Sequence, residues 1–261
     1  MPMPAKKPAT TLIPVQLSEM EFYEFILPHL SMPKRGPKCK LGYHRLFNLI
    51  LWVLYTGMQW KCLPVPKDLE GKAEIHYTTV YKAFARWSDD GSLEHPFIAS
   101  VKHLAHHQQL DLNVLHGDGT NTVAKKGGDG IGYSGYKHQK GEKIIAIIDN
   151  HGYILTPLPI APVNEADSVL LPEGLKALKW VAKLTGLRIE GSYINLDGAF
   201  DSKSNRKAIF NAGMIPNIPE NPRNRKTTKR GRKRLFHAAI HTLEAVAKFL
   251  MPSDSVTVES W

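Results

Sequence analysis

Cysteine is scarce in this chain: only Cys39 and Cys62 occur among its 261 residues. Two thiols cannot build a disulfide framework or a four-cysteine zinc site, so the sequence fits a reducing compartment. Long apolar runs are missing too. No stretch of eighteen apolar residues occurs, and the start, residues 1–7, has no apolar core of the signal-peptide kind. We therefore expect a cytoplasmic protein without a membrane span.

Acidic residues are outnumbered. Lysine and arginine total 34 against 24 aspartates and glutamates, which gives a formal net charge of +10. A positive charge of this size favours a polyanionic partner, because neutralised phosphates release their condensed counterions. An apolar share of 43% is typical of a globular protein, and the length allows one large domain or two ordinary ones. The composition predicts a globular protein that binds nucleic acid.

The first hundred residues predict helices. Ser18 and Glu21 form a capping-box pattern at the start of a short helix, which Pro28 limits. A second, amphipathic helix ending near Gly57 is indicated by apolar residues at three- and four-residue steps: Leu46, Leu49, Ile50, Val53 and Leu54. A third follows Thr78, its expected N-cap, with the apolar set Val80, Phe84 and Trp87.

The third helix is basic. Lys82 and Arg86 fall outside its apolar stripe, where they are exposed to solvent or to a ligand. Three short helices ending in a basic one are typical of a helix-turn-helix domain, whose last helix enters the major groove of DNA. We therefore predict DNA contacts for Lys82 and Arg86. A small helical bundle with solvated basic side chains fits the same pattern, and both interpretations stay open here.

From Val114 onward the pattern changes to strands, first in hairpins and then alternating with helices. This order predicts an α/β domain with a mixed sheet. Asp118 and Asp197 each stand at the expected end of an apolar strand, and such carboxylates can share a Mg²⁺ ion with substrate phosphates. Taken singly, each is better explained as a turn residue. Asp201 is predicted to be a helix N-cap.

A dense basic run precedes a helix expected from Leu235. Its position favours contact with the DNA backbone beside an active site, although a solvated loop would have the same composition. The predicted DNA-contacting residues of this run are Arg223, Arg225, Lys226, Lys229, Arg230, Arg232, Lys233 and Arg234.

Four segments together give the sequence a family resemblance: Leu49–Trp60, Thr79–Trp87, Asp118–Thr120 and Asp197–Ser202. The first two resemble the N-terminal helical domain of bacterial insertion-sequence transposases of the DDE type, in the branch grouped with insertion sequence five. The other two resemble the first and second catalytic aspartate motifs of that family. The resemblance runs from about Lys34 to Ile240, with an apparent insertion around residues 67–75.

This resemblance implies an α/β fold: an RNase H-like mixed-sheet catalytic domain preceded by a small all-α, helix-turn-helix-like domain. The expected order is a basic arm with a short helix (1–33), the helical DNA-binding domain (34–100), a connector (101–113), the catalytic domain (114–251) and an atypical tail (252–261). The implied activity is binding of the terminal repeats of an insertion sequence, followed by DNA cleavage and strand transfer that depend on Mg²⁺ or Mn²⁺. Asp118 and Asp197 would be metal ligands. The implied partner is double-stranded DNA, at the element ends and the target, bound by a homo-oligomer at the nucleoid.

The third carboxylate departs from the family pattern. The family places a glutamate on a helix after the basic loop, followed by a basic residue and an aromatic one. Here the helix expected from Leu235 carries Glu244 without that signature, and Lys248-Phe249 stands about one turn later. We take Glu244 as the third catalytic ligand, on one helical face with His237 and His241; a solvated helix glutamate is the alternative. The ending after Pro252 is unlike the family and indicates a truncated or frameshifted reading frame. The alternative functions are therefore a catalytically defective relative that only binds DNA, and an RNase H-like nuclease unrelated to transposition.

Overall fold

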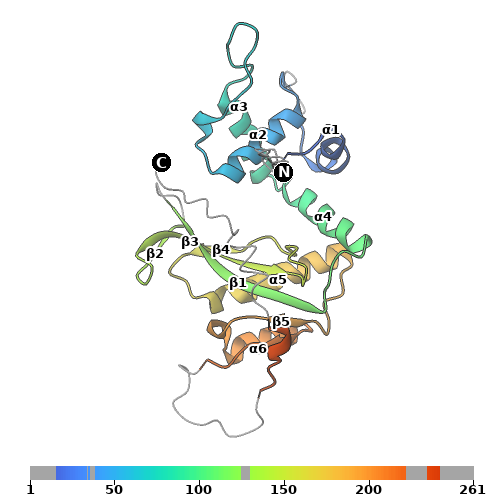
Figure 1. Ribbon diagram of the computed structural model, residues 1–261, viewed down its shortest axis with the longest axis vertical. Helices are drawn as coiled ribbons and strands as arrows, with labels where there is room; N and C mark the ends of the chain where they lie inside the picture. The colour runs from blue at the N-terminus through green and yellow to red at the C-terminus, as the bar shows by residue number, and fades with distance from the viewer. Residues whose placement is uncertain (1–15, 34, 36–38, 125–129, 222–233, 242–261) are drawn as a thin grey trace, which may run out of the picture. The chain divides into compact units, whose positions relative to one another are not determined.

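The computed structural model describes residues 16–33, 35, 39–124, 130–221 and 234–241. The chain divides into two compact units, residues 1–100 and 101–261 (Figure 1). The first is helical and the second is built on a six-stranded sheet. Among the described helices, none has the length and apolar character needed to cross a membrane.

The first unit begins at the predicted capping box, which is confirmed. The Ser18 hydroxyl accepts from the Glu21 N–H, and the Glu21 carboxylate accepts from the Ser18 N–H at 2.8 Å. The helix α1 (Glu19–Glu21) continues as a π-helical turn over Phe22–Ile26 and a 3₁₀ turn over Leu27–His29. Because Phe22 is fully buried, this helical run is anchored in the core of the unit.

Two longer helices complete that core. The helix α2 (Tyr43–Thr56) ends at Gly57, whose φ of 66° is the left-handed C-cap that glycine favours. The helix α3 (Tyr77–Asp89) buries Trp87 completely, and the indole N–H donates to the Ser31 carbonyl at 2.8 Å. This bond joins the N-terminal turns to α3, so residues 19–30 share one core with α2 and α3. The boundary expected at residue 33 therefore does not separate two cores.

Two sequence expectations for these helices are wrong in detail. Leu54 is 56% exposed, because the apolar stripe of α2 ends at Val53. The N-cap of α3 is His76 rather than Thr78: the His76 ring accepts from the Thr78 N–H. Both differences lie at the edge of an element, where the position of a neighbouring segment decides which residue is covered or capped.

The connection between α2 and α3 is long. Residues 57–76 include a 3₁₀ turn (Trp60–Cys62) and a β-bridge between Lys67 and Ala73, closed by the Asp68 carboxylate on the Lys72 N–H. A helix-turn-helix joins its two helices by a turn of about three or four residues. The helical unit thus departs from a compact helix-turn-helix, and the expected insertion lies in this loop. The helix α4 (Glu94–His106) follows.

The second unit has the strand order β2-β3-β1-β5-β6, with β4 also paired to β3. Pairs among β1 to β4 are antiparallel, whereas β1–β5 and β5–β6 are parallel. The bounds are β1 Val114–Val123, β2 Gly132–Ser134, β3 Gln139–Ile148, β4 Ile160–Pro162, β5 Tyr193–Asn195 and β6 Ile215–Asn217. The helix α5 (Asp167–Thr185) leads from β4 to β5, and α6 (Lys203–Asn211) leads from β5 to β6. An antiparallel meander followed by two parallel strands with helical crossovers is the RNase H-like topology, as expected.

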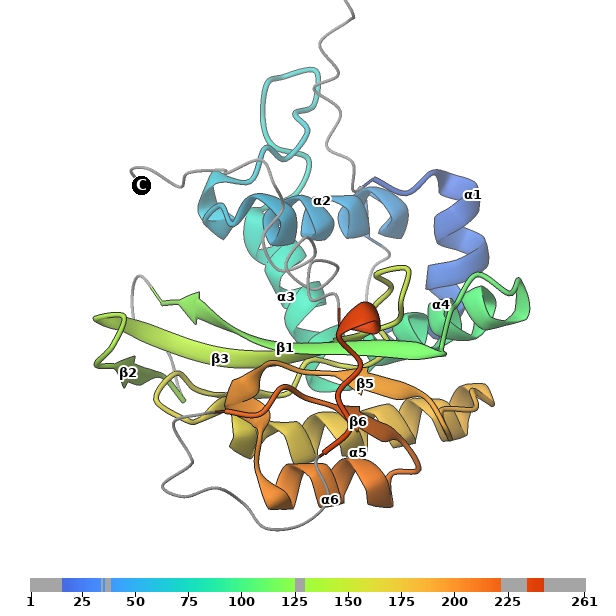
Figure 2. The same cartoon turned by 60° about the horizontal axis from the view of Figure 1, so that its bottom comes forward.

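The two helices cover one face of this sheet (Figure 2). Gly174 lets α5 approach closely, since a Cβ there would lie 3.3 Å from Ile145 and 3.4 Å from Ile147. Side chains alternate along a strand, so the neighbours of Ile145 and Ile147 on β3 point to the opposite face. The helix α5 runs through Pro172 without interruption.

The segment 234–241 crosses the face opposite to α5 (Figure 2). A helix from Leu235 was expected, but within the described residues this segment holds only the 3₁₀ turn η6 (Ala238–Ile240). His237 is extended, because its backbone groups bond to the side chain of Asn217 rather than to a helical turn. The expectation of one helical face for His237 and His241 is therefore wrong.

Candidate active site

The parallel pairing of β1 and β5 brings Asp118 and Asp197 together. His116 is the register partner of Asn195, and each aspartate lies two residues beyond one member of this pair. Because side chains two apart point the same way, both carboxylates lie level on the face opposite to α5. Asp197 follows β5 as predicted. Asp118 does not end its strand, however: β1 continues to Val123 because β3 pairs with it along that length.

Each carboxylate is oriented by a backbone N–H. Asp118 Oδ1 accepts from Gly119 at 2.8 Å, and Asp197 Oδ1 accepts from Ala199 at 2.9 Å, as the N-cap of the 3₁₀ turn η4 (Gly198–Phe200). Within the part of the chain that the structure describes, no lysine, arginine or histidine forms an ion pair with either carboxylate. The two acids are close enough for their charges to interact, and neither has an ion-pair partner among the described residues.

The electrostatics of Asp118 reflect this arrangement. Burial of the side chain raises its pKa, and the negative charges of Asp197 and Asp167 raise it further. The Gly119 N–H and the positive charge of Lys137 act in the opposite direction but do not cancel the rise. A cation between the carboxylates would relieve this repulsion.

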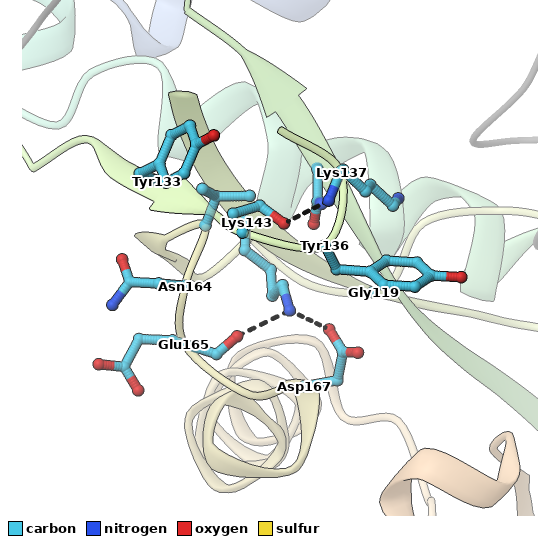
Figure 3. Close-up of a pocket in the computed structure, with 12 residues that line it drawn as sticks. Gly119, Tyr133, Tyr136, Lys137, Lys143, Asn164, Glu165 and Asp167 are labelled. Carbon is cyan, nitrogen blue, oxygen red and sulfur yellow. Dashed lines mark hydrogen bonds and ion pairs between the residues drawn. The ribbon is translucent and has the colours of Figure 1, made fainter. Parts of the chain in front are cut away.

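A third acid, Asp167, was not anticipated from the sequence. It begins α5, and the Lys143 ammonium lies 3.0 Å from its Oδ1 while also donating to the Glu165 carbonyl at 2.7 Å (Figure 3). Gly119 makes room for it, since a Cβ at Gly119 would lie 2.5 Å from Asp167 Oδ1. Because Lys143 neutralises this carboxylate, Asp167 is a poor metal ligand. The sequence feature that could have indicated a close neighbour here is Gly119, directly after Asp118.

The remaining donors can be tested for a fit to Mg²⁺. Among the described residues, no group of three or more histidine, cysteine or acidic side chains is placed to hold a metal ion. Mg²⁺ nevertheless needs only one or two carboxylates when waters and substrate phosphates fill its other positions, and carboxylates suit Mn²⁺ as well. Asp118 and Asp197 fit that requirement. The predicted third ligand, Glu244, lies outside the described residues.

Asp201 serves the fold rather than a metal. Arg206 Nε and Arg234 Nη1 lie 2.9 and 2.6 Å from its Oδ1, and the Asn221 N–H donates to its Oδ2. Burial alone would raise the pKa of Asp201, but the hydrogen bonds from Arg206 and Asn221 and the two positive charges lower it. The N-cap of α6 is Ser202, so the N-cap prediction for Asp201 is wrong.

A buried ladder of polar side chains fixes the segment 234–241. Asn217 exchanges two hydrogen bonds with the His237 backbone, at 2.8 and 3.1 Å, and donates to Asn195 Oδ1 at 2.7 Å. Asn195 in turn donates to the Ile240 carbonyl and lies 3.4 Å from the His116 ring. The ladder residues His116, Asn195 and Asn217 are at most 1% exposed.

The described segment ends beside β5. The His241 ring contacts the Leu196 carbonyl at 3.0 Å, directly before Asp197. Sequence reasoning missed Asn195 and Asn217 because each reads as a polar residue at the end of a short strand. Their signal was the same residue type at matching positions of two apolar strands.

Three of the residues predicted to contact DNA, Lys82, Arg86 and Arg234, are among the described residues. Lys82 is exposed on α3, whereas Arg86 is half-buried with its guanidinium 5.6 Å from the Trp87 ring centroid. Arg234 is already paired with Asp201, and DNA contacts from its remaining nitrogen atoms stay a prediction. The other predicted contacts, from Arg223 to Lys233, lie outside the described residues.

Comparison with known structures gives only distant similarity. The piggyBac transposase synaptic complex with hairpin DNA matches at 13% identity and a TM-score of 0.42, over 81% of this chain and 52% of that one. The Mos1 transposase paired-end complex with left transposon end matches at 9% identity and a TM-score of 0.30, over 71% and 61%. The chain thus spans about half the length of the piggyBac chain. Similarity at these scores bears on neither fold nor activity.

Sequence comparison is more specific. No curated protein matches the chain. Residues 19–97 match the family model described as "Putative transposase of IS4/5 family (DUF4096)". This region, which contains α1, α2 and α3, is similar to the putative transposases of the IS4/5 family.

Proposed function

We propose that the protein is a DNA transposase of the DDE type, which binds the ends of an insertion sequence and catalyses DNA cleavage and strand transfer. The observation that carries the proposal is the pair Asp118 and Asp197, on one face of an RNase H-like sheet, with no ion pair to either carboxylate among the described residues. The family match of the helical unit supports it independently.

The two carboxylates would hold Mg²⁺ or Mn²⁺ together with phosphate oxygens of the DNA. When bound there, the metal would supply Lewis-acid stabilisation of the oxygens that attack and leave in phosphodiester chemistry. The chain's own contribution is orientation. The N–H groups of Gly119 and Ala199 each fix one oxygen of a carboxylate by a hydrogen bond. Because the pKa of Asp118 is raised, protons would compete with a metal ion for this carboxylate more strongly than for an ordinary aspartate.

Glu244 remains our proposed third ligand. It follows His241 by three residues, and His241 is anchored at Leu196, the residue before Asp197. The anchoring of His241 beside Asp197 supports the assignment, because Glu244 is only three residues further along the chain. The DNA partner would be gripped by Lys82, Arg86 and the basic run 223–234, in a homo-oligomer assembled on double-stranded DNA at the nucleoid.

The decisive experiment is cleavage of a DNA that carries the element's terminal repeats, in the presence of Mg²⁺. Asp118→Asn and Asp197→Asn should each reduce cleavage by more than the about 10–100-fold that loss of a supporting outer-shell partner costs. Asp89→Asn, at an exposed position on α3, is the matched control and should cleave like the parent. A Mg²⁺-induced rise in melting temperature, present in the parent and lost in both site variants, gives a second readout.

A second candidate function is a relative that binds DNA without cutting it. The specific observation in its favour is that only two uncompensated carboxylates meet among the described residues. It predicts salt-sensitive binding to the element ends, with no cleavage by the parent chain at any Mg²⁺ concentration. Equal cleavage by the parent, Asp118→Asn and Asp197→Asn would contradict the assignment of both ligands.

A further inference from the structure

Two large aromatic side chains stand in solvent on the hairpin formed by β2 and the start of β3. Tyr133 is 52% exposed and Tyr136 is 93% exposed. Neither ring contributes to the core, so the fold gives no reason for them. Residues 130–141 also contain two lysines and a histidine but no acidic residue. Aromatic rings interleaved with basic side chains are typical of surfaces that bind unpaired nucleic acid.

The hairpin closes one side of a cavity of about 410 Å³ (Figure 3). This volume lies within the roughly 300–1,000 Å³ of small-ligand sites. Besides the two tyrosines, its lining includes Asn121 on β1 and Asn164 in the loop before α5. Two amide side chains thus share a concave site with two aromatic rings, a combination that suits a flat ring with hydrogen-bonding edges.

The hairpin has a defined shape. The Ser134 hydroxyl accepts from the Lys137 N–H at 3.2 Å, and His138 takes a left-handed φ of 50°. The Tyr133 hydroxyl lies 3.3 Å from the His138 ring. These contacts hold the turn at the tip, where Tyr136 stands. Preorganisation of this kind lowers the entropy cost of binding, because few rotamers need to be fixed.

The cavity adjoins the candidate metal site. Gly119 lines it and directly follows Asp118, and the ion pair of Lys143 with Asp167 borders it (Figure 3). Lys137, another lining residue, is close enough for its positive charge to act on Asp118. Gly119 and Asn121 face the α5 side of β1 and Asp118 faces the other, so a nucleotide held here would lie near the carboxylates but across β1 from them.

We infer that this hairpin cavity binds the base of an unpaired nucleotide of the DNA substrate, with Tyr136 stacking on the base and Asn121 and Asn164 facing its edge. The inference rests on the proposed function, since it assigns a part of the same DNA to a site beside the metal centre. It adds a recognition step that the carboxylates alone do not provide. The alternative is that the lysines of the hairpin contact the backbone of paired DNA. Such contacts need no aromatic ring, so removal of the Tyr136 ring distinguishes the two.

The test uses the full chain in EDTA and two fluorescent probes: a duplex of the element end, and the same duplex with one unpaired 2-aminopurine. Tyr136→Ala should weaken binding of the unpaired probe by about 5- to 150-fold, the range expected for loss of one base–aromatic stack. It should leave duplex binding unchanged. Tyr136→Phe, which keeps the ring, should bind both probes like the parent. The parent should also quench the 2-aminopurine, and Tyr136→Ala should not.

Tyr153→Ala is the matched control, because Tyr153 is 41% exposed elsewhere in the same unit. Unchanged affinity of Tyr136→Ala for the unpaired probe would overturn the inference. Equal weakening of both probes would also overturn it, since the hairpin would then grip the backbone of paired DNA. If the parent binds neither probe, the proposed function itself fails, and this result is distinct from the other two.

Discussion

The side-chain amide of Asn217 donates to Oδ1 of Asn195 at 2.7 Å, linking β6 to β5 in the interior of the second unit. Each asparagine then reaches a backbone group of the segment 234–241. Side-chain amides thus satisfy backbone groups of this segment, as hydrogen bonds between neighbouring strands do within the sheet. Because a buried polar group left unsatisfied costs about 1–3 kcal/mol, this pairing has one favourable arrangement.

Replacing Asn217 by leucine should release the segment 234–241. Asn217→Leu removes both bonds to His237 and leaves Asn195 without its donor. We expect a loss of about 1–3 kcal/mol in the free energy of unfolding. Hydrogen exchange at the His237 amide should become fast, measured by mass spectrometry of the full chain. Asn211→Leu, at an exposed position on α6, should change neither quantity, and slow exchange at His237 in Asn217→Leu would contradict the ladder.

Asp118→Asn should stabilise the metal-free protein. The raised pKa of Asp118 means that the folded state holds a proton more tightly than the unfolded one, so stability falls as pH rises through that pKa. The amide keeps the hydrogen bond from Gly119 and removes the charge. We expect a gain of about 0.5–2 kcal/mol at pH 7, which shrinks as pH is lowered toward 4. Thermal unfolding in EDTA measures it, and a gain independent of pH would show that repulsion is not the cause.

Asp201→Asn should destabilise the protein, in contrast to Asp118→Asn. The pKa of Asp201 is lowered, so its contribution to stability is present above the unfolded value and disappears as pH falls through the folded one. Loss of the charge leaves Arg206 and Arg234 unpaired, at a cost of about 3 kcal/mol at pH 7. Urea unfolding across pH should show parent and variant converging in acid. Parallel curves would contradict an ionic role.

Gly119→Ala should disturb the ion pair behind the metal site. The new methyl group would lie 2.5 Å from Asp167 Oδ1, so the carboxylate must move away from Lys143. We expect a loss of about 1–3 kcal/mol, the usual cost of overpacking, measured by urea unfolding. Gly135→Ala is the control, since a Cβ there meets no atom within 4 Å. Equal stability of the two variants would show that the close approach does not matter.

The local sequence determined much of this architecture. Apolar residues at helical spacing predicted α2 and α3, and the change of pattern from Val114 onward predicted strands alternating with helices, because these patterns depend only on which side of one element is buried. The mixed sheet and the choice of Asp118 and Asp197 also came from the sequence. Each acid sits beside an apolar strand, and the family resemblance paired them.

Only the tertiary structure decided how the site is assembled. That Asp201 pairs with Arg206, that Asp167 occupies the space left by Gly119, and that Asn195 and Asn217 hold residues 237–240 all depend on strand register. Such contacts join residues far apart in the chain, and no local pattern encodes them. For the same reason the helix expected from Leu235 is replaced by an extended segment: buried amides across the sheet compete with its helical hydrogen bonds, and they win only once the sheet is formed.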